Sequence, residues 1–207
     1  MKYKPLFITG IGTNVGKTIV SAVLAEQLCA DYWKPVQAGD LDCSDSKKVS
    51  GLISNKTTVI HPERFKLNLS SSPHKAAAHD GITIYPEDFC LPGTDNRLLI
   101  EGAGGLFVPL SADFLMSDLM LRLKAEIILV IKNYLGCINH TLLSLYALKN
   151  IGLSLKHVVF NGEFDTETKA VITAHLPAKT SLSAMPELLS IDKNTIKNAP
   201  LQIIINK

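Results

Sequence analysis

The sequence has few cysteines, little net charge and no long hydrophobic run. Its four cysteines include no Cys-x-x-Cys pair, so we expect reduced thiols and a cytoplasmic protein. The net charge of +2 gives no basis for a nucleic-acid partner. The longest apolar runs, such as residues 127–131, are far shorter than a membrane span requires. We therefore expect neither a nucleic-acid partner nor a membrane anchor.

A cleavable leader is also not indicated. Lys2 and Lys4 are followed by only a few apolar residues and then by glycines, which does not fit a signal peptide. The 207 residues, of which 46% are hydrophobic, suffice for a full core. We expect a soluble globular chain that forms a single domain over residues 1–207.

The most informative stretch is residues 6–18, LFITGIGTNVGKT. An apolar β-type run leads into glycines and then into a helical pattern, which is the strand–loop–helix order of a P-loop. Glycines allow backbone N–H groups to approach a polyphosphate, and the helix start at Gly16 adds its positive dipole end. Lys17 can reach the β- and γ-phosphates, and the Thr18 hydroxyl can bind Mg²⁺.

This loop departs from the strict P-loop pattern at one position. Ile11 stands where the first glycine belongs, and five residues rather than four separate Gly10 from Gly16. The alternative is an ordinary strand-to-helix turn that happens to contain Gly-Lys-Thr. The strand before and the helix after the loop favour the P-loop.

The remaining chain alternates between apolar runs and helical patterns. Further strands are expected at 32–36, 97–101, 126–131 and 157–160, with a possible terminal strand at 201–205. Helices are expected at 17–30, 47–54, 118–124, 138–150 and 166–175. Residues 56–95 show only a helical hint at 75–79, so one or two helices there escape the pattern. This order predicts an α/β fold, P-loop NTPase-like, with a mostly parallel sheet and helices on both faces.

Polar residues suited to catalysis or to metal binding follow several of the predicted strands. Glu101 ends one strand and precedes Gly-Ala-Gly-Gly, which favours an Mg²⁺ ligand over a solvated strand-end acid. Asp45 lies in a polar loop near the same edge, where its position is more typical of a helix cap than of a ligand. Lys34 also follows a strand, and in isolation it would be a surface lysine.

Residues 136–140, Gly-Cys-Ile-Asn-His, open a predicted helix. The free N–H groups of a helix start bind either a carboxylate or only water, and the pattern does not decide between them. Cys137 and His140 also allow a nucleophilic pair, although such partners normally come from distant segments.

Taken together, these motifs resemble the dethiobiotin synthetase family of the P-loop superfamily. The resemblance rests on the loop Gly10–Thr18, on Lys34-Pro35-Val36, Ser72-Pro73-His74, Glu101–Gly105 with Pro109-Leu110-Ser111, and Leu135–His140. Their order and spacing cover residues 6 to about 187. The five-residue P-loop spacing is a trait of that family.

The resemblance implies an ATP- and Mg²⁺-dependent ligase. One amine of 7,8-diaminononanoate takes up CO₂, supplied from bicarbonate, to form a carbamate. The carbamate oxygen attacks the γ-phosphate of ATP, which gives a carbamic–phosphoric anhydride. The second amine then closes the ureido ring and expels phosphate. The family also implies a homodimer.

The resemblance further assigns roles to individual residues. Lys17, Lys34 and Thr13 form the catalytic set, Lys34 and Thr13 acting on the carbamate or diamine. The metal set is Thr18, Asp45 and Glu101. The nucleotide is bound by Gly12, Asn14, Val15, Gly16, Lys17, Thr18 and Ile19, with Asn161, Pro186 and Glu187 around the adenine. Gly136, Cys137, Ile138 and Asn139 receive the substrate carboxylate at a neighbouring subunit's site.

Two departures from the family pattern affect expected contacts. Gln37-Ala38-Gly39 stands where the family often has Ser or Thr, so a hydroxyl contact to substrate is missing there. Asn14 stands where an acid is frequent, so one charge near the metal is absent.

Three other classes are alternatives. A MinD- or ParA-like switch ATPase usually carries a lysine just after the first glycine, where Ile11 and Gly12 stand here. A cobyrinate-type amide synthase needs a glutamine-hydrolysing domain, for which this length leaves no room. A non-enzymatic nucleotide-binding module would bind ATP without turnover when diamine and CO₂ are added.

Overall fold

The computed structural model describes residues 3–201, which form one large and one small parallel sheet. The large sheet has the order β4-β2-β6-β1-β7-β8-β9. Its strands are β1 Leu6–Gly10, β2 Asp31–Trp33, β4 Ile60–His61, β6 Leu98–Glu101, β7 Glu126–Lys132, β8 Leu155–Asn161 and β9 Ser181–Met185. The small sheet pairs β3 Val36–Ala38 with β5 Phe65–Leu67. All of these pairings are parallel.

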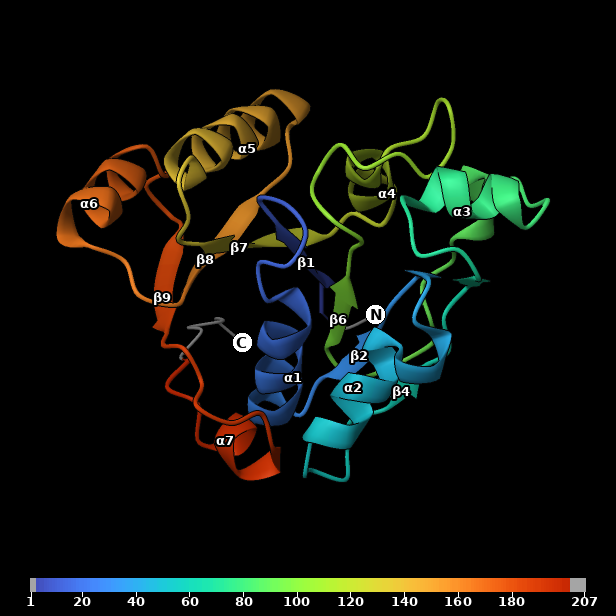
Figure 1. The fold of residues 1–207 in the computed structure, drawn as a ribbon, viewed down its shortest axis with the longest axis horizontal. Coiled ribbons are helices and arrows are strands. Elements are labelled where there is room, and N and C mark those ends of the chain that lie inside the picture. Colours follow the sequence, from blue (N-terminus) through green and yellow to red (C-terminus); the bar gives the residue numbers. More distant parts are fainter. Residues whose placement is uncertain (1–2, 202–207) are drawn as a thin grey trace.

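Helices cover both faces of the large sheet (Figure 1). One face carries α1 Lys17–Leu28, α2 Asp45–Leu52 and α7 Lys193–Lys197, and the other carries α4 Met116–Arg122, α5 Cys137–Ile151 and α6 Thr166–Ala174. Helix α3 Pro73–His79 packs on the small sheet. Short 3-10 turns cover Leu41–Cys43 and Pro86–Asp88. The predicted α/β architecture, with a parallel sheet between helical layers, is confirmed.

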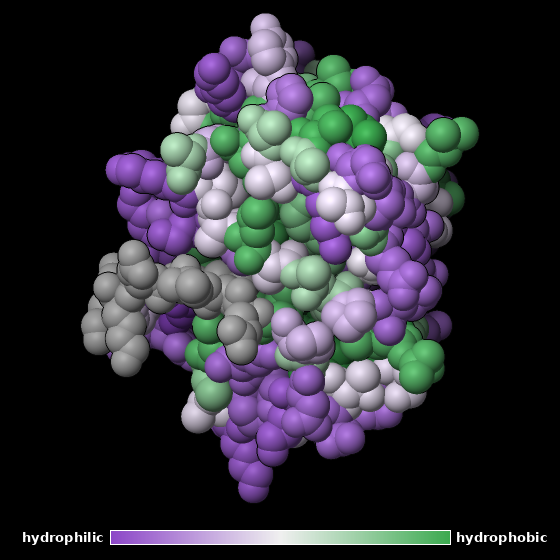
Figure 2. All heavy atoms as spheres, turned by 90° about the vertical axis from the view of Figure 1, so that its left-hand side faces the viewer, coloured by the Kyte–Doolittle hydropathy of each residue, from purple (hydrophilic) through white to green (hydrophobic). Residues whose placement is uncertain are grey.

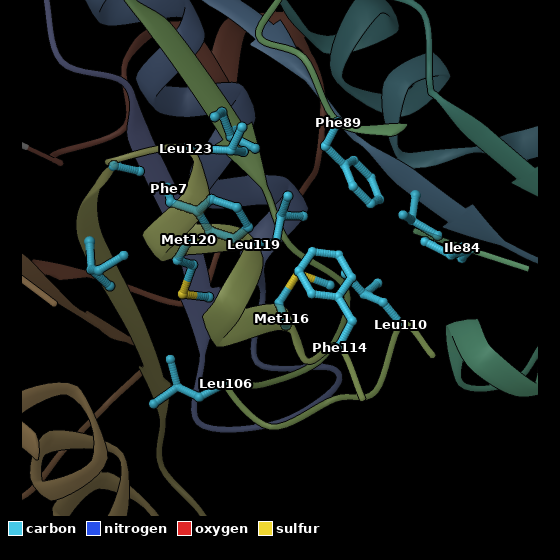
Figure 3. Close-up of a cluster of buried hydrophobic side chains, with 14 of the residues drawn as sticks. Phe7, Ile84, Phe89, Leu106, Leu110, Phe114, Met116, Leu119, Met120 and Leu123 are labelled. Atoms are coloured by element: carbon cyan, nitrogen blue, oxygen red, sulfur yellow. The ribbon is translucent and has the colours of Figure 1, made fainter. Parts of the chain in front are cut away.

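The structure explains why the central strand β1 is apolar throughout and does not alternate with polar residues. Leu6 and Ile8 belong to the buried cluster beneath α1, whereas Phe7 points to the opposite cluster with Met116 and Leu119 of α4 (Figure 3). Successive side chains of a strand face opposite sides, and both sides are covered here. Burial of each such side chain stabilises the fold by about 1.5–3 kcal/mol.

The predicted strand at 32–36 is wrong as a single element. The chain forms β2 up to Trp33 and then β3 from Val36, and these two strands belong to different sheets. Pro35 has no N–H for a ladder and restricts Lys34 before it, so the chain leaves the large sheet at this point. This break places Lys34 at the carboxyl end of β2.

The predicted cap at Asp45 is also wrong. Helix α2 begins at Asp45 itself, and Ser44 is the capping residue: its Oγ accepts a hydrogen bond from the Lys47 N–H at 3.3 Å. The helix therefore starts two residues earlier than predicted and ends at Leu52. The Asp45 carboxylate is consequently free for another partner.

Several elements were not predicted from the sequence. Residues 56–95 contain β4, β5 and, at the hinted position, α3; β9 and α7 also went unpredicted. Most of the possible terminal strand at 201–205 lies outside the described residues. No helix in the described part of the chain is long and apolar enough to cross a bilayer.

Candidate active site

The carboxyl ends of β1, β2, β6 and β8 meet at one edge of the sheet, as the parallel pairing requires. A cleft of about 790 Å³ opens there. Among the residues lining it are Thr13, Asn14, Gly16, Lys17, Thr18, Ile19, Lys34, Asp45 and Glu101. The structure thus brings the predicted catalytic and metal-binding residues together with most of the predicted phosphate loop.

The loop after β1 needs a glycine at position 16 for its backbone conformation. Gly16 has φ +93°, and a Cβ there would collide with the Asn161 side chain, so only glycine fits. The extra residue of the loop, Ile11, donates its N–H to Val130 O at 3.2 Å. Ile11 therefore adds one hydrogen bond to the pairing of β1 with β7.

Lys17 lies at the start of α1 and folds back onto the loop. Its Nζ donates to Gly12 O at 2.9 Å, and the residue is almost fully buried. Burial, reinforced by the positive charge of Lys34, lowers the pKa of Lys17 to about 8. The ammonium is therefore still mostly charged at neutral pH and points into a loop shaped for phosphate.

Lys34 lies in a network of charged side chains, of which Lys34 and Glu101 are buried and Asp45 is partly buried. Its Nζ is 2.8 Å from Asp45 Oδ2 and 3.3 Å from Glu101 Oε1, and it also donates to Gly102 O at 3.1 Å. Burial alone would lower the pKa of Lys34, but the charges of Glu101 and Asp45 outweigh it and raise that pKa. Burial likewise opposes the charge on Asp45, yet Lys34 holds the pKa of Asp45 below its usual value. Lys34 and Asp45 therefore form an ionised pair at neutral pH.

The oxygens around this network fit a magnesium ion. Thr18 Oγ1 donates to Glu101 Oε1 at 2.8 Å, and the carboxylates of Glu101 and Asp45 both contact Lys34, so one hydroxyl and two carboxylates lie close together. Mg²⁺ prefers such hard oxygen donors, with waters and substrate phosphates completing its shell. Residues 3–201 contain no group of three or more His, Cys, Asp or Glu placed to hold a metal. A cation here would thus depend on oxygens from outside the chain.

A second pocket of about 360 Å³ adjoins the cleft through Ile19, which lines both. It contains three residues predicted to surround adenine: Asn161, Pro186 and Glu187. The Asn161 amide nitrogen donates to Val15 O at 2.8 Å, so it ties the end of β8 to the phosphate loop. Apolar side chains, namely Ile19, Met185, Leu188 and Ile191, give the pocket walls on which a flat base can stack.

Residues 136–139 are not brought into either pocket. Gly136 caps α5 with φ +101°, and the Cys137 N–H is already bonded to Tyr134 O at 2.9 Å. The Cys137 thiol is buried against Asn133, while His140 bonds the Tyr134 hydroxyl at 2.7 Å. The alternative of a Cys137–His140 nucleophilic pair is therefore wrong.

Sequence reasoning missed the roles of five residues that line or support the cleft. Gln37 accepts the Asp45 N–H at 3.1 Å and so fixes the start of α2. Ser70, Ser71 and Ser72 line the same cleft as Gln37 and Ala38, the positions where the family often has Ser or Thr. Tyr32 donates to Glu101 Oε2 at 2.9 Å. The Ser72-Pro73-His74 motif was the available signal for the serines, whereas nothing local marks Tyr32.

A parallel sheet whose first strand leads through a Gly-Lys-Thr loop into a helix defines the P-loop nucleotide-binding class. Comparison with known proteins agrees: the family model described as "AAA domain" matches residues 4–195. A ParA family ATPase from Chlorobium tepidum has the same fold, with a TM-score of 0.57 and 15% identity over 96% of this chain and 98% of its own.

The sequence relatives are more specific. An ATP-dependent dethiobiotin synthetase BioD of Christiangramia forsetii is 52% identical over 169 residues, which is 82% of this chain and 81% of the relative. One from Cytophaga hutchinsonii is 45% identical over 185 residues, 89% of each chain. The chain therefore belongs to the ATP-dependent dethiobiotin synthetase family.

Proposed function

We propose that this protein forms dethiobiotin from 7,8-diaminononanoate, CO₂ and ATP. One amine captures CO₂ as a carbamate, whose oxygen attacks the γ-phosphorus while ADP leaves. The second amine attacks the resulting anhydride carbonyl, closes the ureido ring and releases phosphate. The observation that carries this proposal is the convergence of Lys17 and Lys34 on one cleft beside the Gly-Lys-Thr loop.

The chemistry needs positive charge more than it needs a base. Carbamate and γ-phosphate are both anions, so they react only where their repulsion is offset and their geometry is fixed. Lys17 would leave Gly12 O and bind the γ-phosphate, while Lys34 would stabilise the carbamate. Thr13, which also lines the cleft, would orient the diamine or the carbamate.

Thr18, Asp45 and Glu101 would hold Mg²⁺ with the nucleotide. When bound, the ion would neutralise negative charge that develops between the β- and γ-phosphates. The exposed side of the second pocket would take the adenine, with Asn161, Pro186 and Glu187 around it. The phosphate loop from Gly12 through Ile19 would bind the phosphates, largely through backbone N–H groups.

We also propose a homodimer in which residues 136–139 serve the neighbouring subunit. Tyr146 and Leu143 on α5 are 69% and 58% exposed, and Leu135 just before α5 is fully exposed. With Leu142 and Asn139, the two α5 side chains line an apolar groove of about 410 Å³. Figure 2, which looks at the side formed by α5, α6 and β9, shows apolar side chains exposed between polar ones. Such a patch is typical of an interface.

The first turn of α5 would receive the substrate carboxylate. Its amides have no carbonyl in their own helix to bond, and the helix dipole favours an anion there. The Cys137 amide is already bonded to Tyr134, which leaves the amides of Gly136, Ile138 and Asn139 and the Asn139 side chain as donors. The chain would act as one P-loop domain over residues 1–207 in the cytoplasm. Its four free cysteines agree with a reducing compartment.

Diamine-dependent phosphate release tests the proposal. The protein is supplied with ATP, Mg²⁺, bicarbonate and 7,8-diaminononanoate, and each component is omitted in turn. We expect stoichiometric phosphate and dethiobiotin only in the complete mixture. Phosphate release that ignores the diamine would point instead to a ParA-like switch ATPase, and nucleotide binding without turnover would point to a binding module.

A further inference from the structure

Tyr32 is a fully buried tyrosine whose hydroxyl points at the end of the neighbouring strand. Its ring packs in the cluster beneath α1, with Leu24, Val49 and Leu99 among the members. The phenolic oxygen donates to Glu101 Oε2 at 2.9 Å.

The strand register explains why a tyrosine is needed for this contact. Tyr32 pairs with Leu99, and Glu101 follows two residues later, on the same face of β6. The side chain must therefore reach along the neighbouring strand by roughly 6.6 Å, two residues of rise. A phenol spans that distance, whereas a serine or threonine hydroxyl does not.

The two oxygens of Glu101 have separate partners. Oε2 is bound by Tyr32, while Oε1 accepts from Thr18 at 2.8 Å and from Lys34 at 3.3 Å. The terminal torsion of a glutamate is soft, so packing alone does not fix the carboxylate plane. A donor on one oxygen fixes that plane and leaves the other oxygen toward Thr18.

We propose that Tyr32 is a positioning residue that holds Glu101 with Oε1 facing Thr18 and the cleft, ready to bind the metal ion. This inference rests on the proposed role of Glu101 as a ligand. Tyr32 acts only through Glu101: it is a neutral donor that fixes an orientation while leaving the negative charge of the carboxylate available to the cation.

Tyr32→Phe tests this inference, because phenylalanine fills the same space without the hydroxyl. Binding of Mn²⁺ is measured by electron paramagnetic resonance with AMP-PNP present, and AMP-PNP binding is measured separately in EDTA. We expect Mn²⁺ affinity to fall about tenfold, as for loss of other groups that orient metal ligands. AMP-PNP affinity in EDTA should stay unchanged. Tyr134→Phe, which removes a hydrogen-bonded hydroxyl elsewhere, should change neither quantity.

A double-mutant cycle separates failure of the inference from failure of the proposed function. If Tyr32 acts through Glu101, the double variant Tyr32→Phe/Glu101→Gln binds Mn²⁺ no more weakly than Glu101→Gln alone. Normal Mn²⁺ affinity in Glu101→Gln would overturn the proposed ligand itself. Weakened binding in Glu101→Gln but wild-type binding in Tyr32→Phe would overturn the positioning role. An equal loss of AMP-PNP affinity in EDTA would show a general structural role and would also overturn it.

Discussion

The cleft beside the phosphate loop and the start of α5 are opposite kinds of surface. In the cleft, the buried Lys34 is bonded both to the buried Glu101 and to the partly buried Asp45. At the start of α5, apolar side chains such as Leu135 face solvent, and the substrate-binding residues proposed there line neither pocket. The cleft is thus organised within one chain, whereas the start of α5 is arranged to meet something outside it.

The charges in the cleft sharpen this contrast. The cleft is lined by equal numbers of lysines and acidic residues, namely Lys17, Lys34 and Lys48 against Asp40, Asp45 and Glu101. A divalent cation alone would give this site an excess of positive charge, and a triphosphate alone an excess of negative charge. Metal and nucleotide are therefore expected to enter together.

The largest effect on turnover is expected from Lys17→Ala, which removes a cation from the cleft. The γ-phosphate would lose its nearest cation, and turnover should fall by at least about 10³-fold. Steady-state phosphate release measures the change. Lys75→Ala, at an exposed lysine on α3, is the control and should be as active as the wild type. A near-normal rate for Lys17→Ala would remove the basis for a P-loop function.

Lys34→Met breaks the cleft in a second way. The side chain keeps its length, but Asp45 and Glu101 lose their common cation. We expect turnover to fall about 10²-fold and the free energy of unfolding to fall by about 3 kcal/mol, because the buried Glu101 carboxylate loses its cation. Urea denaturation without Mg²⁺ measures the free energy of unfolding. Unchanged stability would mean that the network contributes little to the fold.

Asn139→Ala removes a proposed carboxylate donor at the start of α5 and leaves the cleft beside the phosphate loop unchanged. A lost hydrogen bond to a carboxylate should raise the KM for diamine about tenfold. ATP binding, followed by calorimetry, should not change because Asn139 lines neither pocket of the cleft region. Weakened ATP binding would assign the start of α5 to the nucleotide instead.

A smaller effect, on the affinity for ATP, is expected when the pH is changed. Because the pKa of Lys17 is about 8 in the free protein, its ammonium loses its proton as pH rises through that value. A phosphate favours the protonated form, so ATP affinity should be flat below pH 7 and about fourfold weaker at pH 8.5. Titrations from pH 6.5 to 9 measure this, and Lys17→Ala should lack the step. An identical step in that variant would assign the dependence to another group.

The sequence predicted what depends on local pattern. Continuous apolar strands, the Gly-Lys-Thr loop and the acid at the end of β6 were all visible because burial on both faces and phosphate binding restrict residue type. β9 was missed because it is an edge strand with alternating exposure and no apolar run. The Lys34–Asp45 ion pair depends on how α2 packs, and Tyr32 meets Glu101 only through strand register; neither leaves a local signature.

A mixed dimer tests the division between the two regions most directly. Lys17→Ala and Asn139→Ala subunits are co-expressed with different tags, and the heterodimer is purified and assayed at low diamine concentration. If residues 136–139 serve the neighbouring cleft, one site in each heterodimer combines an intact Lys17 with an intact Asn139. The heterodimer should then turn over at about half the wild-type rate, far above either homodimer. A heterodimer that only averages the two homodimers would show that Asn139 acts within its own chain and would contradict the account.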